Sequence, residues 1–410
     1  MRSLTVVLLM AVALTPTAAQ TILPAASACS QEEVTATAAQ VGAARKALLG
    51  LPVGDFQTDV SLAARHTIQS MQSAIGKFVG AYMACVAAQP DPARIQKELS
   101  DQSHALRLPA GNMSNDQIPP DLGKYGFELW FDVKSTPEQR LIAVKAGFDI
   151  ACGSDTMLTV FAPEGDSWKE VLRWQSQPYK TVAGAFEAFD YGISPPDESG
   201  NWYAVAHSIM PWCSSTWSSI RYAVLRSSAD PLKPKVLMSR SDSMWWGSED
   251  FGKLVVSRDS FDLRFHSNSI DGGVHNRVWI RHYAVHGDAV RRAQPVAVSP
   301  RDFVDEWIVS PWRDASAWSS RQSPEQLSQM HATLHKLNHH FGFDFKSAQK
   351  CSGTPPTVQV EITQIKDRGE DGDTFYFKVV GNGTFQMKSV STSPDSKCGG
   401  ADILDTMATQ

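Results

Sequence analysis

The sequence predicts a mainly β fold with α-helical segments, in which four-stranded antiparallel sheets repeat along the chain. Residues 125–299 consist of short alternating apolar runs separated by turn residues, which is typical of antiparallel strands. Helix-start signals precede this region and hairpin signals follow it, so we expect an N-terminal α-helical hairpin and a small C-terminal β-meander. Within the region, a pattern that begins with an aromatic residue and ends in serine recurs at offsets of 54 and 59 residues. Its copies are FDIACGS (148–154), WYAVAHS (202–208) and FDLRFHS (261–267).

The first residues, MRSLTVVLLMAVALTPTAAQ, contain one arginine, an apolar run from Val6 to Leu14 and small residues near Ala19. This order predicts a secretory signal peptide over residues 1–20. The apolar run is much shorter than the ~20 residues that a membrane span needs. We therefore expect a secreted or periplasmic protein without a transmembrane segment. Processing before Cys29 is the alternative, and it would give a lipid-anchored protein.

Six cysteines in an exported chain predict three disulfides. None of them has the CxxC spacing of a zinc or redox site. Because they fall two by two along the sequence, we expect the pairs Cys29–Cys85, Cys152–Cys213 and Cys351–Cys398.

The N-terminal helical hairpin is predicted over residues 29–107. Residues 30–33, SQEE, form a capping box, which predicts a helix over 31–49. A second helix follows, in which apolar residues recur at helical spacing up to Cys85. If the two helices run antiparallel, Cys29 and Cys85 lie at the same end of the pair, which favours a disulfide between them.

A linker rich in proline, glycine and asparagine is predicted over 108–124, before the repeated core at 125–299. Each period of the core, about 55–60 residues, holds about four short strands, as a β-propeller blade does. About three such units fit, whereas propellers usually have four to eight blades. We predict a propeller-like arrangement, with a β-sandwich as the second choice. Cys152 and Cys213 lie in consecutive units, so their disulfide would join neighbouring sheets.

Helices and a second β module are predicted after the core. Three Ser-Pro steps, at Ser299, Ser310 and Ser323, have the residues preferred at helix starts, so short helices are expected over 300–350. In residues 351–410, three further strands alternate with the turn sequences EDGD and GNG. A disulfide between the two cysteines of this last segment would close it.

Composition and motifs give few indications of chemistry. The net charge of −5 provides no basic surface for nucleic acid. No nucleophile elbow or phosphate-binding glycine loop occurs, so we expect no cofactor and find no catalytic motif. His331, His335 and His339 have a spacing that could hold a metal on a helix. They drift away from the apolar stripe and lack the HExxH carboxylate, so we interpret them as a solvated face and expect no metal.

The best candidate for a ligand site is SDSMWWGSED, residues 241–250. Tryptophan rings can stack on sugar rings, and neighbouring carboxylates can accept hydrogen bonds from sugar hydroxyls. Adjacent tryptophans cannot both point inward from an extended strand, so at least one should be exposed or covered by another element. The candidate residues are Asp242, Trp245, Trp246, Glu249 and Asp250.

Two functions are consistent with the sequence. The first is an exported, non-catalytic binding or scaffolding protein that recognises glycan or cell-envelope components. The second is an extracellular hydrolase that acts on glycosides through carboxylates at one end of the β core. The absence of catalytic motifs favours the first.

Overall fold

The computed structural model describes residues 29–51, 62–87, 90–105, 125–126, 128–136, 138, 140–150, 153–175, 189–210, 216–245, 252–274, 276–339, 342–366 and 369–404. Three predicted features lie outside the described residues: the signal peptide, the linker over 108–124 and the pair Cys152–Cys213. Within the described residues the fold is mainly β, with four four-stranded antiparallel sheets and a few helices.

The N-terminal helices are α1 (Gln31–Leu49), α2 (Leu62–Ala84) and α3 (Pro92–Ala105). Ser30 is the N-cap of α1, as predicted, and its hydroxyl accepts a hydrogen bond from the Glu33 N–H at 3.2 Å. The predicted disulfide between Cys29 and Cys85 is present. Helix α3 is an addition to the predicted hairpin. Among its described side chains, the buried apolar ones are Ile95 and Leu99, too short a stripe to stand out in the sequence.

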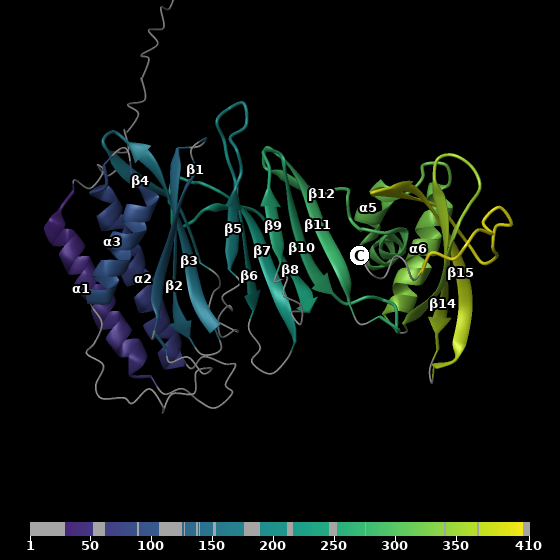
Figure 1. The fold of residues 1–410 in the computed structure, drawn as a ribbon, viewed down its shortest axis with the longest axis horizontal. Coiled ribbons are helices and arrows are strands. Elements are labelled where there is room, and N and C mark those ends of the chain that lie inside the picture. Colours follow the sequence, from purple (N-terminus) through teal and green to yellow (C-terminus); the bar gives the residue numbers. More distant parts are fainter. Residues whose placement is uncertain are drawn as a thin grey trace, which may run out of the picture.

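The first sheet consists of β1 (Leu129–Thr136), β2 (Leu141–Ile150), β3 (Gly153–Glu164) and β4 (Ser167–Gln175). The three helices cover one face of this sheet (Figure 1), and a single apolar cluster joins them. Arg173 of β4 also donates a hydrogen bond to the Gly76 carbonyl of α2 at 3.1 Å. Both helices and sheet therefore belong to one packed unit.

Two further sheets follow in chain order. The second consists of β5 (Asp190–Ile193), β6 (Ala204–Met210), β7 (Trp217–Arg226) and β8 (Lys235–Trp245). The third consists of β9 (Lys253–Val256), β10 (Ser260–Ser267), β11 (Arg277–His286) and β12 (Ala289–Arg292). Separate apolar clusters join the first sheet to the second and the second to the third. The three sheets therefore stack face to face, as Figure 1 shows.

The prediction of about four short strands per unit agrees with the three sheets of the core. WYAVAHS overlaps β6 and FDLRFHS lies within β10, and each of these strands is the second of its sheet in chain order. FDIACGS instead covers the end of β2 and the start of β3. The run QPVAVS (294–299), which its alternating apolar residues predict to be a strand, is not one, and β12 is the fourth strand of its sheet. Proline lacks the N–H that a ladder needs, which explains why Pro295 lies beyond the sheet.

The three stacked sheets have the strand number expected of propeller blades. No described sheet closes into a barrel. The propeller-like and sandwich arrangements, and the sequence repeat itself, therefore stay predictions.

The C-terminal unit again combines helices with a sheet. Its helices are α4 (Pro300–Val309), α5 (Trp312–Ala315), a 3-10 turn (Ser316–Trp318) and α6 (Pro324–Asn338). The Ser299 hydroxyl caps α4 as predicted, accepting from the Asp302 N–H at 3.1 Å. The sheet has one strand more than predicted. It consists of β13 (Phe343–Lys350), β14 (Thr357–Ile365), β15 (Asp371–Asn382) and β16 (Thr384–Ser391).

The predicted pairing of Cys351 with Cys398 is present in this unit. One apolar cluster joins the helices to the sheet. In the described part of the chain, no helix is long and apolar enough to cross a membrane. Two disulfides together with this finding are consistent with an extracellular location.

Candidate functional site

Asp242 is the one candidate carboxylate that the structure describes. Its partners belong to a buried group of charged and polar side chains. It lies on β8, where its carboxylate faces the third sheet. Arg281 of β11 donates to both carboxylate oxygens, from Nε to Oδ2 at 2.9 Å and from Nη2 to Oδ1 at 3.1 Å. The Tyr222 hydroxyl donates to Oδ2 at 2.8 Å. Such two-point contacts are among the strongest ion pairs in proteins, and they engage both carboxylate oxygens of Asp242.

Arg281 continues the contact chain into the C-terminal unit. Its Nη1 atom donates to Oε1 of Glu306, in α4, at 2.8 Å. Arg292 of β12 donates to the same oxygen at 3.0 Å, and Arg277 of β11 donates to Oε2 at 2.9 Å. Three guanidinium groups from the third sheet therefore converge on one carboxylate of α4.

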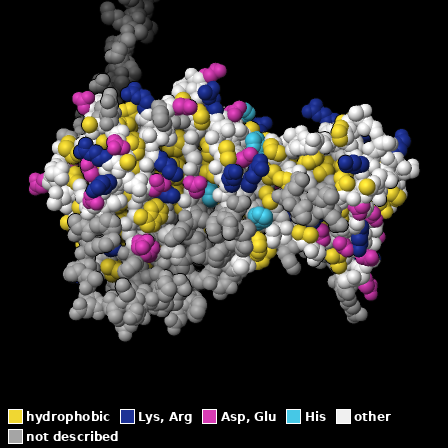
Figure 2. Space-filling model, in the orientation of Figure 1, with side chains coloured by type: hydrophobic (Ala, Val, Ile, Leu, Met, Phe, Trp, Pro, Cys, Tyr) yellow, Lys and Arg dark blue, Asp and Glu magenta, His cyan; other side chains and the backbone are white. Residues whose placement is uncertain are grey.

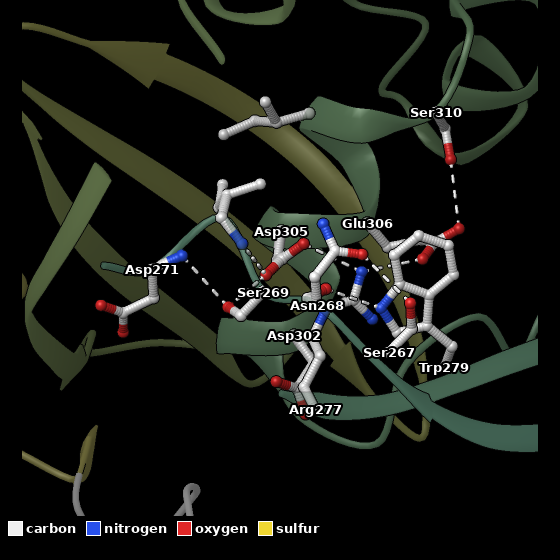
Figure 3. A network of polar contacts seen from close by, with 12 residues as sticks. Ser267, Asn268, Ser269, Asp271, Arg277, Trp279, Asp302, Asp305, Glu306 and Ser310 are labelled. Atoms are coloured by element: carbon white, nitrogen blue, oxygen red, sulfur yellow. Dashed lines mark hydrogen bonds and ion pairs between the residues drawn. The ribbon is translucent and has the colours of Figure 1, made fainter. Parts of the chain in front are cut away.

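Asp305, the neighbour of Glu306, makes a second set of contacts (Figure 3). Its Oδ1 atom lies 2.9 Å from Nη2 of Arg277. Its Oδ2 atom accepts from the Ser269 hydroxyl at 2.6 Å and from the Ile270 N–H at 3.0 Å. These contacts tie α4 to the segment between β10 and β11. We call Asp242, Arg277, Arg281, Arg292, Asp305 and Glu306 the arginine–carboxylate network.

Aromatic rings flank the guanidinium groups of this network. Arg281 lies 4.1 Å from the Trp279 ring centroid, and Arg277 lies 5.0 Å from it. Arg292 lies 5.5 Å from the ring centroid of Tyr283. A cation over an aromatic face is stabilised by the ring quadrupole. Because the rings also exclude water, the ion pairs operate at low dielectric.

Burial and neighbouring opposite charges shift the pKa values of these groups in opposite directions. Burial alone would raise the pKa of Glu306, but Arg281, Arg292 and Arg277 outweigh it and hold the pKa well below its usual range. Burial would lower the pKa of Arg281, and the Glu306 and Asp242 carboxylates raise it instead. Both groups therefore stay charged at any physiological pH. A carboxylate held in this way cannot act as a general acid.

Another buried arginine, Arg301, also joins α4 to the segment between β10 and β11. Arg301 of α4 donates to Oδ2 of Asp271 at 2.6 Å and to Oδ1 of Asp302 at 3.1 Å. Its guanidinium also lies 4.6 Å from the ring centroid of Phe345, in β13. The third sheet, α4 and the C-terminal sheet are thus linked by charge as well as by apolar packing.

The sequence contains a signal for this network that hydrophobic patterning did not reveal. Alternate residues of a strand share a face, so the β11 sequence RVWIRHY places Arg277, Trp279, Arg281 and Tyr283 together. That face is the buried one. Arginines at core positions of a strand require carboxylate partners, and the partners lie in another element, far along the chain.

The other candidate ligand residues are distributed differently. Trp245 is the last residue of β8 and pairs across the strands with Trp217 of β7. Its ring lies edge-to-face to the His266 ring, with centroids 6.3 Å apart. Asp242 and Trp245 are an odd number of positions apart, so their side chains leave opposite faces of β8. Trp246, Glu249 and Asp250 lie outside the described residues.

The histidines that share a position in the predicted repeat do not share an environment. The Nδ1 atom of His266 lies 3.1 Å from the Oδ1 atom of Asn276. His207 of β6 is 1% exposed, and neither ring nitrogen has a hydrogen-bond partner. Burial lowers the pKa of His207 to about 4, although Asp190 opposes the shift. The two histidines therefore make different contacts, although they occupy the same position of the predicted repeat.

The interpretation of His331 and His335 as a solvated face is wrong. His331 is 3% exposed, and its Nε2 atom donates to the Ser310 carbonyl at 2.9 Å. The Nδ1 atom of His335 donates to the Ile308 carbonyl at 2.8 Å. Both carbonyls belong to the C-terminal end of α4, where helices leave acceptors unpaired. The packing of α6 on α4 is a long-range contact that the local spacing of the histidines did not indicate.

The N-terminal helices contain two hollows. An open groove of about 540 Å³ between α1 and α2 is lined mainly by polar residues, among them His66, Ser70 and Lys77. A cavity of about 450 Å³ lies near Cys85, where the Tyr82 hydroxyl donates to Glu98 at 2.5 Å. Neither hollow is lined by Asp242 or Trp245.

The surface view adds no strongly charged region. On the face in Figure 2, basic and acidic side chains are interspersed over the helices and the stacked sheets. No protein-family model matches the chain, and no curated protein matches it significantly.

Proposed function

We propose that this chain is an exported, non-catalytic binding or scaffolding protein. The proposal rests mainly on the buried carboxylates in the described part of the chain, all of which are paired. Each of Asp155, Asp271, Asp302, Asp305 and Glu306 has a cationic or hydrogen-bonding partner. Among them, Glu306 is surrounded by Arg281, Arg292 and Arg277, which hold its pKa well below its usual range, so it cannot supply the proton that general acid catalysis needs.

The architecture favours a supporting role. Stacked sheets of closely packed side chains deform little, and the arginine–carboxylate network fixes α4 to the third sheet. Disulfides close the helical unit and the C-terminal unit. A rigid, cross-linked body of this kind can present a binding surface outside the cell without a conformational change.

We place the ligand contact at the end of β8, as the sequence suggested, with a glycan or cell-envelope component as the ligand. Two half-buried tryptophans meet there, Trp245 and its cross-strand partner Trp217. The hydroxyls of Ser219 and Ser241 lie 2.6 Å apart on the same two strands. Aromatic faces beside hydroxyl groups suit a sugar, which has an apolar ring face and a polar rim. Trp246, Glu249 and Asp250 belong to this proposal as neighbours in sequence.

The test is a binding measurement against a panel of soluble glycans and cell-wall fragments. Wild type should bind at least one member, and Trp245→Ala should weaken that binding at least about tenfold, the loss expected of a stacking aromatic residue. Trp130→Ala, a half-buried tryptophan of the first sheet, should leave binding unchanged. Absence of binding to every member, or equal loss in both variants, would contradict the glycan form of the proposal.

The hydrolase alternative is tested with the same panel. Asp242 is held by Arg281 and Tyr222, which leaves Glu249 and Asp250 as its candidate carboxylates. Turnover of any member that is abolished in Glu249→Gln or Asp250→Asn would replace the binding proposal with an enzymatic one.

A further inference from the structure

Helix α6 presents a row of histidines in mutual contact. His331, His335 and His339 are spaced four residues apart and lie on one side of the helix. The ring centroids of His331 and His335 are 5.6 Å apart, and those of His335 and His339 are 4.9 Å apart. The three rings nevertheless have different surroundings, which divide the row into an inner and an outer part.

The inner ring, His331, is committed to packing. It is buried, donates to the Ser310 carbonyl and stands edge-to-face to Trp307 with centroids 4.8 Å apart. Burial lowers its pKa. A ring enclosed in this way has no position for a further ligand.

His335 has one nitrogen fixed and one available. A carbonyl oxygen can only accept, so the contact between Nδ1 and the Ile308 carbonyl at 2.8 Å places the proton on Nδ1. The Nε2 atom then has a free lone pair, and it is not among the buried nitrogens without a partner. Histidines that bind metals commonly donate their second N–H to a carbonyl in this manner, which fixes the tautomer and the ring orientation.

His339 completes the arrangement at the end of the helix. It is exposed, and its ring makes no hydrogen bond within the described part of the chain. Its ring stands edge-to-face to His335, and rotation of an exposed side chain about its bonds is fast and costs little. The unpaired carbonyls of the last helical turn also favour a nearby cation.

We propose that His335 and His339 form a two-histidine site for a divalent transition-metal ion of the zinc, nickel or copper type. Imidazole nitrogen is a preferred ligand of these ions. No group of three or more histidine, cysteine or acidic side chains with ligand geometry occurs among the described residues. The chain therefore supplies two ligands, and water fills the other positions. Such a site is open and exchangeable, unlike a closed structural zinc site, and it is independent of the proposed glycan contact on β8.

The test is calorimetric titration of the untagged mature protein with Zn²⁺ near neutral pH. We expect one Zn²⁺ per chain in wild type and an affinity at least about tenfold weaker in His335→Gln and in His339→Gln, because each removes one of two ligands. His282→Gln, which alters the His282–Asp262 contact of the third sheet, should bind Zn²⁺ as wild type does. His340→Gln should also bind as wild type does.

The variants keep the proposal falsifiable. His335 supports α4, so His335→Gln can lower stability, whereas His339 is exposed and its replacement should leave the thermal transition unchanged. Failure of wild type to bind Zn²⁺, or wild-type affinity in His339→Gln, would overturn the site. So would loss of binding in His340→Gln combined with retention in His335→Gln.

Discussion

Arg281 of β11 holds Asp242 of β8 by two hydrogen bonds, at 2.9 and 3.1 Å, and the same guanidinium donates to Glu306 of α4 at 2.8 Å. One side chain thus connects the second sheet, the third sheet and the C-terminal helices. The residue chosen from the sequence as a ligand contact, Asp242, is part of a structural joint. Both of its carboxylate oxygens accept hydrogen bonds within the protein.

Glu306→Gln should destabilise the protein strongly. The substitution leaves three buried guanidinium groups facing a neutral amide, and removal of one partner of a buried ion pair typically costs about 3–5 kcal/mol. Urea unfolding followed by circular dichroism measures the loss. Glu325→Gln, an exposed acid in the first turn of α6, should change the free energy of unfolding by less than ~0.5 kcal/mol. Similar effects of the two substitutions would show that the network contributes little.

The stability of the protein should fall in mild acid because of His207. Burial lowers the pKa of His207 from 6.5 to about 4, with Asp190 opposing the shift and Lys145 adding to it. The unfolded chain therefore binds the proton more readily than the folded protein does. The stability contribution is complete above pH 6.5, declines as the pH falls toward about 4 and does not change further below it.

The size of this effect is on the order of 3 kcal/mol, from the free energy per pKa unit. His207→Leu should remove this part of the pH dependence, measured as the unfolding free energy at several pH values. His286→Gln, at the exposed end of β11, should retain it. An unchanged acid profile in His207→Leu would assign the effect to other groups.

Two glycines of α2 should respond to alanine in opposite directions. A methyl group on Gly76 would lie 2.1 Å from Nη1 of Arg173, so the guanidinium would have to leave its place between Glu170 and the helix backbone. We expect a loss of about 1–3 kcal/mol, as for other overpacked sites. Gly80→Ala meets nothing within 4 Å and should gain ~0.5–1 kcal/mol from helix propensity. Thermal melts of both variants decide the matter, and a stabilising Gly76→Ala would contradict the described packing.

Non-reducing peptide mapping should recover Cys29 with Cys85 and Cys351 with Cys398. The remaining pair predicted from the sequence is Cys152 with Cys213. Peptides that join Cys152 or Cys213 to any other cysteine would refute the sequence-based pairing.

Replacement of both Cys351 and Cys398 by serine should cost about 2–4 kcal/mol of unfolding free energy, because the unfolded chain regains the freedom that the closed loop removes.

Local patterns in the sequence predicted local structure well. The Ser30 and Ser299 caps depend on residues three positions apart, and both form the expected hydrogen bonds. The strands of the second and third sheets follow from alternation and turn residues, which act within a few positions. Pairing cysteines by position succeeded for the two disulfides that the structure describes.

Long-range contacts account for what the sequence did not predict. No local feature of the sequence around His331 indicates that it is buried. The element that covers it is α4, a separate helix earlier in the chain. Arg277 and Glu306 are 29 positions apart, and no periodicity links a charged residue on a strand to an acid on a later helix. QPVAVS resembles a strand in composition, yet the chain has already left the sheet after β12.

The arginine–carboxylate network joins the stacked sheets to the C-terminal unit as one body. Hydrogen–deuterium exchange of wild type and Glu306→Gln measures whether the two parts depend on each other. We expect amides of α4 and of β11 to lose protection together in the variant, because both depend on the same buried carboxylate. Loss of protection confined to α4, with β11 exchanging as in wild type, would contradict it.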